Sequence, residues 1–136
     1  MIELLRGTYD GWSYEFDINR KITLLCGNSG TGKTYFYDLC VSHFKLDYDN
    51  IQTCNGEDGD ISTTLNNIKE LHDQLFIFDH ADRWTLTHDI RQAILQSNNQ
   101  FVIVGRAPNG LLLFPDNMKQ IRIDLNSQKA WFENII

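Results

Sequence analysis

The residues from position 27 to position 34 have types and a spacing that suit phosphate binding. Gly27, Gly32, Lys33 and Thr34 occupy the fixed positions of the pattern Gly-x4-Gly-Lys-[Ser/Thr]. Glycine lets the backbone curl closely around an anion, and successive amide groups then point inward at it. We therefore expect the whole stretch to bind phosphate groups, through Gly27, Asn28, Ser29, Gly30, Thr31, Gly32, Lys33 and Thr34.

The flanking segments fit this interpretation. The apolar residues 22–26 predict a buried strand before the loop, and apolar residues at helical spacing from Phe36 to Phe44 predict an amphipathic helix after it. A helix that begins near Lys33 directs its positive end at the phosphates. Lys33 is expected to reach the β- and γ-phosphates of a nucleotide, and the Thr34 hydroxyl to bind Mg²⁺. A chance match is the alternative, and the strand–loop–helix context argues against it.

A second oxygen ligand for Mg²⁺ follows a second apolar run. Residues 75–78 predict another buried strand, and Asp79 stands at its carboxyl end. A carboxylate in this place, beside a phosphate-binding loop, can hold Mg²⁺ directly or through water. The alternative is an aspartate that only serves the turn after the strand. We expect Thr34 and Asp79 to be the metal ligands.

Three further residues are candidates for catalysis. His80 can accept a proton or orient a water molecule, or it can simply pack or contact a neighbouring chain. Asp82 is a second candidate for that role, and otherwise a solvated loop acid. Arg106 follows the apolar residues 101–104 closely. It can sense the γ-phosphate and stabilise charge during phosphoryl transfer, or it can be a surface arginine in a turn.

The order of the expected elements predicts an α/β fold. Apolar strands alternate with amphipathic helices, which is typical of a mainly parallel sheet flanked by helices, with the ligand site at the carboxyl ends of the strands. Alternating apolar residues from Trp12 to Ile18, after a turn at Asp10-Gly11, predict an N-terminal antiparallel hairpin. No repeat or linker is visible, so we expect one domain over residues 1–136. Other expected elements are strands over 51–54, 120–125 and 130–136, helices over 61–71 and 87–97, and an exposed, mobile loop over 55–60.

Composition narrows the classes of protein further. The 136 residues carry 12 Lys and Arg against 18 Asp and Glu, and the resulting net charge of -6 argues against direct binding to nucleic acid. Three cysteines without a Cys-x-x-Cys pair favour reduced thiols. No secretory leader and no apolar stretch of membrane-spanning length is visible. We therefore expect a cytoplasmic protein without a membrane span.

Taken together, these motifs resemble the P-loop NTPase superfamily. Residues 27–34 match its Walker A loop and residues 75–79 its Walker B strand. The order of elements up to Arg106 is similar to that of the additional-strand division, which includes RecA-like, AAA+ and ABC-type ATPases. The opening hairpin also resembles the start of ABC and RecF-type ATPase heads. The resemblance implies a parallel sheet in which the strand ending near Arg106 separates the Walker A and Walker B strands.

The resemblance also implies a nucleotide as ligand, with ATP and Mg²⁺ as cofactors. The chain lacks both an Asn-Lys-x-Asp motif that reads guanine and a Leu-Ser-Gly-Gly-Gln-like signature. Many such ATPases have a glutamate after the Walker B aspartate to activate water, whereas this chain has His80. We therefore expect an ATPase with slow hydrolysis that acts with a protein partner or as a homo-oligomer. The alternatives are a nucleotide-binding switch or interaction module that does not hydrolyse ATP, and a phosphotransferase acting on a small molecule.

Overall fold

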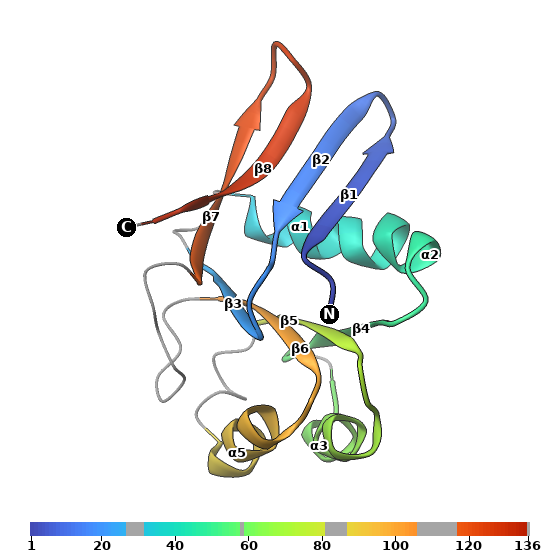
Figure 1. The fold of residues 1–136 in the computed structure, drawn as a ribbon, viewed down its shortest axis with the longest axis vertical. Helices are drawn as coiled ribbons and strands as arrows, with labels where there is room; N and C mark the ends of the chain where they lie inside the picture. The colour runs from blue at the N-terminus through green and yellow to red at the C-terminus, as the bar shows by residue number, and fades with distance from the viewer. Residues whose placement is uncertain (27–31, 58, 81–86, 106–116, 136) are drawn as a thin grey trace.

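The computed structural model describes residues 1–26, 32–57, 59–80, 87–105 and 117–135. Within this part of the chain, eight strands form one mixed sheet in the order β1-β2-β8-β7-β3-β6-β5-β4, which curves into a half-barrel (Figure 1). The strands are β1 (Leu4–Tyr9), β2 (Trp12–Asp17), β3 (Ile22–Leu25), β4 (Ile51–Asn55), β5 (Leu75–Asp79), β6 (Gln100–Val104), β7 (Met118–Asp124) and β8 (Lys129–Asn134). The helices are α1 (Lys33–Leu39), which continues through a π-helical segment η1 (Cys40–Phe44) into α2 (Lys45–Asp47), then α3 (Ile61–Glu70) and α5 (His88–Gln96).

Four parallel strands make up one half of the sheet. β3 pairs with β6 as far as Leu25 opposite Val104, and β6 pairs with β5 as far as Ile103 opposite Phe78. β5 pairs in turn with β4. Every residue of β3, β5 and β6 is buried, as expected for strands covered on both faces. β6 therefore lies between β3 and β5, which is the strand order that the resemblance implied.

The prediction of a mainly parallel sheet flanked by helices is wrong. Half of the described strands belong to two antiparallel hairpins, β1–β2 and β7–β8, and only short helices accompany the curved sheet. The two hairpins pair with each other through β2 and β8, and β7 joins them to β3. Residues 125–128 connect β7 to β8, and a connection this short excludes the long crossover that a parallel pair requires. The N-terminal hairpin itself is confirmed, with Asp10 and Gly11 at φ 53 and 82 in its turn.

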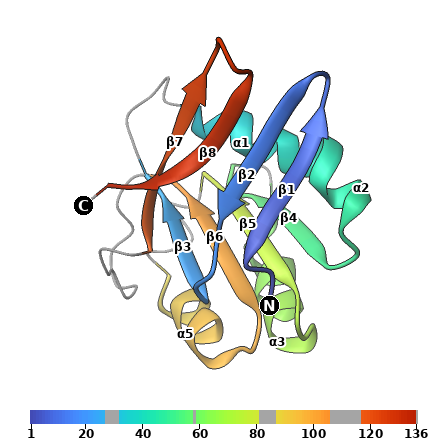
Figure 2. The ribbon, with the colours of Figure 1, turned by 45° about the horizontal axis from the view of Figure 1, so that its top comes forward.

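Two hydrophobic clusters cover the opposite faces of the parallel strands. One face carries Leu25, Ile77 and Val104, which pack with aromatic residues of the N-terminal hairpin and of α1. The other carries Phe76 and Phe78, which pack with α3 and α5. Figure 2 shows α3 and α5 together on one side of the strands and α1 on the other. Successive residues of these strands therefore face α1 and the α3–α5 side in turn, and α1 contacts β5 and β6.

Most of the individual elements were predicted correctly from the sequence. The expected strands near 51–54, 120–125 and 130–136 are β4, β7 and β8, and the expected helices over 61–71 and 87–97 are α3 and α5. Among the helices that the structure describes, none combines the length and the apolar character needed to cross a membrane.

Candidate functional site

The strand and the helix on either side of the phosphate-binding loop are present. β3 ends at Leu25, the buried Cys26 follows, and the described chain resumes at Gly32 with α1 beginning at Lys33. The other loop residues, Gly27, Asn28, Ser29, Gly30 and Thr31, lie outside the described part of the chain. The residues that flank the loop, Cys26 before it and Gly32 to Thr34 at its end, therefore locate the expected phosphate site.

Gly32 occupies a position that only glycine fits. Its φ of 91 is in the left-handed region, and a Cβ atom placed there would lie 2.8 Å from Ile121 Cγ2. The Gly32 carbonyl accepts the first backbone hydrogen bond of the helix, from the Phe36 N–H at 3.0 Å. A side chain at position 32 would strain the backbone and require the Ile121 side chain of β7 to shift.

Lys33 and Thr34 form the first turn of α1. Thr34 is exposed and Lys33 is half-buried. Burial raises the pKa of the Cys26 thiol, and the positive charge of Lys33 opposes this rise. The lysine charge therefore acts at the end of β3, where the loop begins.

Asp79 is a buried carboxylate at the end of β5. It is 5 % exposed, and its Oδ1 accepts the backbone N–H of His80 at 2.9 Å. Burial raises the pKa of Asp79, the carboxylates of Asp38 and Glu57 raise it further, and His80 opposes the rise. A bound cation would offset this desolvation penalty and hold the carboxylate in its charged form.

The start of the loop and Asp79 lie at the same edge of the sheet. Because Leu25 pairs with Val104 and Phe78 with Ile103, Leu25 and Asp79 are level with each other on the two sides of β6. Neighbouring strands are about 4.8 Å apart, so the two backbones are separated by about 10 Å. α1 packs against both β5 and β6, which closes one side of this space. The end of β6 lies between the two, so a ligand that contacts both strand ends would lie beyond the end of β6.

His80 lies between two carboxylates. Its Nδ1 is 3.4 Å from Glu57 Oε1, and its Nε2 is 3.6 Å from Asp79 Oδ2. Its backbone has a positive φ of 51, and 44 % of its side chain is exposed. The ring is therefore accessible at the site, and both of its nitrogen atoms face acceptor groups.

Gly56 is a site residue that sequence reasoning missed. The expectation of an exposed loop over 55–60 is wrong at this position, because Gly56 is buried. Its N–H donates to the Asp79 carbonyl at 2.8 Å, and a Cβ atom here would lie 2.0 Å from the His80 carbonyl oxygen. The available signal was a glycine two residues after the strand expected over 51–54, close to the level where the neighbouring strand ends.

Two of the expected catalytic residues, Asp82 and Arg106, lie outside the described residues. The described chain before Arg106 ends at Gly105, whose N–H donates to the Leu25 carbonyl at 3.1 Å. The end of β6 is thus tied to the end of β3.

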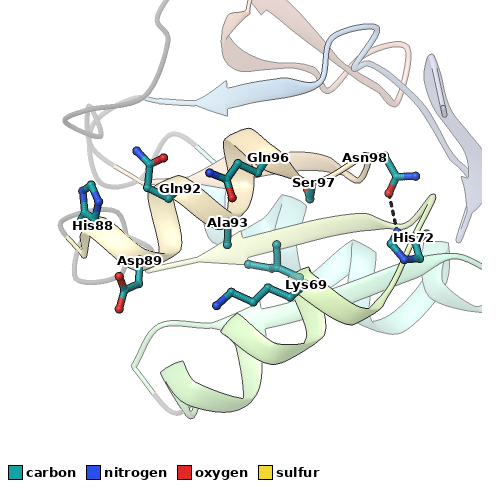
Figure 3. Close-up of a pocket in the computed structure, with 10 residues that line it drawn as sticks. Lys69, His72, His88, Asp89, Gln92, Ala93, Gln96, Ser97 and Asn98 are labelled. Carbon is teal, nitrogen blue, oxygen red and sulfur yellow. Dashed lines mark hydrogen bonds between the residues drawn. The ribbon is translucent and has the colours of Figure 1, made fainter.

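A larger cavity lies away from the expected phosphate site. It has a volume of about 690 Å³ and runs between α3 and α5, where polar side chains such as Lys69, Asp89 and Gln92 line it (Figure 3). His72 and Asn98 close one end through a hydrogen bond of 3.0 Å between Nδ1 and Oδ1. No residue of the expected phosphate site contributes to it. Within the described ranges there is also no cluster of three or more His, Cys, Asp or Glu side chains that could hold a metal.

Comparison with known proteins finds no family model that matches the chain and no curated protein that matches its sequence.

Proposed function

We propose that this chain binds Mg²⁺·ATP at the carboxyl ends of β3 and β5 and hydrolyses it slowly. The observation that carries the proposal is the juxtaposition of two features at one sheet edge. The Gly32-Lys33-Thr34 end of the sequence motif opens α1, and the buried Asp79 lies level with the end of β3, two strands away. The function rests on the sequence motif together with this placement.

The described residues suit the chemistry of a Mg²⁺·nucleotide. Lys33 and the amide groups at the start of the helix would bind the phosphates. Thr34 and Asp79 supply hydroxyl and carboxylate oxygen atoms, the hard ligands that Mg²⁺ prefers, and Mg²⁺ keeps several waters in such sites. Because water and phosphate oxygens supply the remaining ligands, such a Mg²⁺ site does not need three metal-binding side chains from the protein. A bound Mg²⁺ would neutralise charge on the phosphates during transfer.

His80 favours slow hydrolysis. An imidazole can accept a proton or orient water, but here both ring nitrogens face carboxylates, from Glu57 and Asp79. The ring must turn away from one of them before it can hold a water molecule for attack. A glutamate at this position would accept a proton without that rearrangement.

We further propose that a protein partner or a second copy of the chain completes the site. Asp82 and Arg106 lie outside the described residues, and the described His80 is held between the carboxylates of Glu57 and Asp79. Phosphoryl transfer ordinarily needs a cationic group on the transferring phosphate in addition to the loop lysine. Arg106 or a residue from another chain would supply it. The free cysteines Cys26, Cys40 and Cys54 fit a cytoplasmic location for this assembly.

Phosphate release from ATP tests the proposal. Purified protein with Mg²⁺ should release phosphate slowly, and Lys33→Ala and Thr34→Ala should reduce the rate at least about tenfold, because each removes a contact to the phosphates or the metal. Lys45→Ala is the matched control, since it removes an exposed lysine of the same helical segment. An equal rate in the wild type and in Lys33→Ala would contradict the proposal.

The same assay distinguishes the slow ATPase from the second candidate function, a nucleotide-binding switch that does not hydrolyse ATP. The arrangement of His80 between two carboxylates favours this alternative over a fast enzyme. Saturable ATP binding without phosphate release would support the switch. Release that is lost in His80→Ala would exclude it and identify His80 as the group that orients water.

A further inference from the structure

An aromatic cavity separates the N-terminal hairpin from the outer side of α1. Its volume is about 350 Å³, which is within the range of small-molecule sites. The hairpin contributes Tyr9, Asp10, Trp12 and Tyr14, and the helical segment contributes Tyr35, Asp38, Leu39, Ser42 and His43. Figures 1 and 2 show that the hairpin and α1 lie side by side. The cavity contains none of the proposed phosphate or metal ligands, although its Asp38 also raises the pKa of Asp79.

The tyrosines of this cavity are fixed in place. The Tyr9 hydroxyl donates to Asp47 Oδ2, and the Tyr14 and Tyr35 hydroxyls are bonded to each other. Tyr9 also stacks on the His43 ring, with centroids 4.4 Å apart, and its centroid lies 6.0 Å from that of Tyr14. The bond between Tyr14 and Tyr35 uses one of their two hydroxyl protons, and of these two residues it is Tyr35, 41 % exposed, that is accessible from the cavity.

The charge of the cavity is negative. Its lining includes the carboxylates of Asp10 and Asp38 and neither lysine nor arginine among the described residues. The Asp10 carboxylate is close enough to the Tyr14 phenol to raise its pKa, although burial is the larger cause. The ring of His43, which also lines the cavity, is stacked on Tyr9.

We propose that this cavity binds an organic cation of the quaternary ammonium class. Aromatic rings attract such cations through the negative faces of their π-systems, and a nearby carboxylate adds to the attraction. Trp12, the best ring type for this interaction, is half-buried in the lining, and Tyr35, a second lining ring, is 41 % exposed. An anionic ligand would meet the repulsion of Asp10 and Asp38, and a purely apolar ligand would gain no attraction from either carboxylate.

Titration with choline, followed by the amide NMR shifts of the cavity residues, tests this assignment. Choline should give saturable shifts at Asp10, Asp38 and Ser42, and its uncharged carbon analogue 3,3-dimethyl-1-butanol should bind at least about tenfold more weakly. The double variant Asp10→Asn with Asp38→Asn should weaken choline binding by a similar factor. Asparagine tolerates the positive φ of 53 at position 10. Asp73→Asn is the matched control, because Asp73 also has a positive φ, 57, and does not line this cavity.

Trp12→Leu provides a second variant that removes the indole ring and keeps the carboxylates. It should weaken choline binding while ATP binding stays at the wild-type level, so failure of the phosphate site and failure of this cavity are distinguishable. A peptide with one trimethyllysine separates two sources of the same headgroup. Tighter binding of the peptide than of choline indicates a protein partner, and equal or weaker binding indicates a free small molecule.

Two results would overturn the proposal. Equal binding of choline and its neutral analogue would show an apolar pocket without selectivity for charge. Shifts of the cavity residues with ATP but with no ammonium compound in the millimolar range would show that the cavity receives part of the nucleotide.

Discussion

At the scale of single residues, the proposed phosphate site contains two residues, Asp79 and His80, whose conformation or burial lowers the stability of the folded chain. Asp79 is buried with its charge only partly compensated, and His80 has a left-handed backbone. Such arrangements cost stability and are typical of binding sites. The sequence predicted Asp79 and His80 because each follows an apolar run. It did not predict Gly56, whose importance depends on contact with a strand about twenty residues later in the chain.

Asp79→Asn is expected to stabilise the apoprotein at neutral pH. Burial places the pKa of Asp79 above its unfolded value, so the folded chain binds this proton more tightly. The free energy of unfolding therefore falls as pH rises from the unfolded pKa, about 3.9, through the folded pKa, and the penalty is complete above it. The variant should have a higher Tm than wild type at pH 7 and a smaller advantage at pH 4. It should also lose the Mg²⁺-dependent part of ATP binding.

Thermal unfolding at both pH values measures this effect, with the exposed Asp49→Asn as the control. A lower Tm for Asp79→Asn at pH 7 would show that the carboxylate stabilises the apoprotein and that no cation is needed to compensate it.

Gly32→Ala should reduce stability by about 3 kcal/mol and abolish ATP binding. The left-handed backbone costs a Cβ-bearing residue about 1–2 kcal/mol, and the overlap with Ile121 Cγ2 at 2.8 Å adds to that cost. Gly11→Ala is the matched control, since its φ is 82 and its nearest neighbour lies 3.8 Å away. It should lose only about 1–2 kcal/mol. Urea denaturation measures the free energy of unfolding of both variants. Equal losses in Gly32→Ala and Gly11→Ala would contradict the role assigned to the contact with Ile121.

At the scale of elements, local signals predicted which segments form strands and helices, but not the direction in which β7 and β8 pair. β3, β5 and β6 are continuous apolar runs, and each is a parallel strand buried on both faces, as expected. β7 and β8 were expected as strands, but nothing within them indicates which neighbour they pair with. Their antiparallel pairing follows from the four-residue connection between them, and the pairing of β8 with β2 depends on residues more than 100 positions apart. The C-terminal hairpin β7–β8 therefore escaped a prediction based on alternating strands and helices, whereas the N-terminal hairpin was predicted from its turn and its alternating apolar residues.

Asp60→Ala should destabilise α3 without affecting nucleotide binding. The Asp60 side chain caps the helix by accepting the Ser62 N–H at 3.0 Å and the Thr63 hydroxyl at 2.9 Å. Loss of such a cap costs about 1 kcal/mol. Urea denaturation should show this loss, whereas Asp60→Asn, which keeps an acceptor, should stay close to wild type. Equal losses in the two variants would show that charge, and not the capping hydrogen bond, stabilises the helix.

At the scale of the whole molecule, the sheet joins two different halves. The parallel half carries the proposed phosphate site, and the antiparallel half forms the wall of the aromatic cavity. Gln100, buried at the start of β6, connects them through its side chain, which donates to the carbonyls of Ile2 at 2.7 Å and Ile18 at 2.5 Å. Its Oε1 accepts the Ile2 N–H at 3.0 Å. This amide ties the N-terminal hairpin to the parallel strands.

Gln100→Ala should therefore lower the stability of the whole domain by about 2–4 kcal/mol, because it leaves several buried backbone groups unsatisfied. Hydrogen exchange should show increased exchange in β1 and β2 as well as in β6. Gln120→Ala, at a half-buried glutamine on β7, is the control. Increased exchange confined to β6 would show that the two halves are not coupled through this residue.

The most direct test of the account is a calorimetric titration of ATP into the purified protein, with and without Mg²⁺, repeated with Lys33→Ala. The account predicts saturable binding to the wild type that is tighter with Mg²⁺, and loss of binding in Lys33→Ala with the fold intact by circular dichroism. Binding that is unchanged in Lys33→Ala, or no binding to the wild type in the presence of Mg²⁺, would contradict the assignment of the site at the ends of β3 and β5.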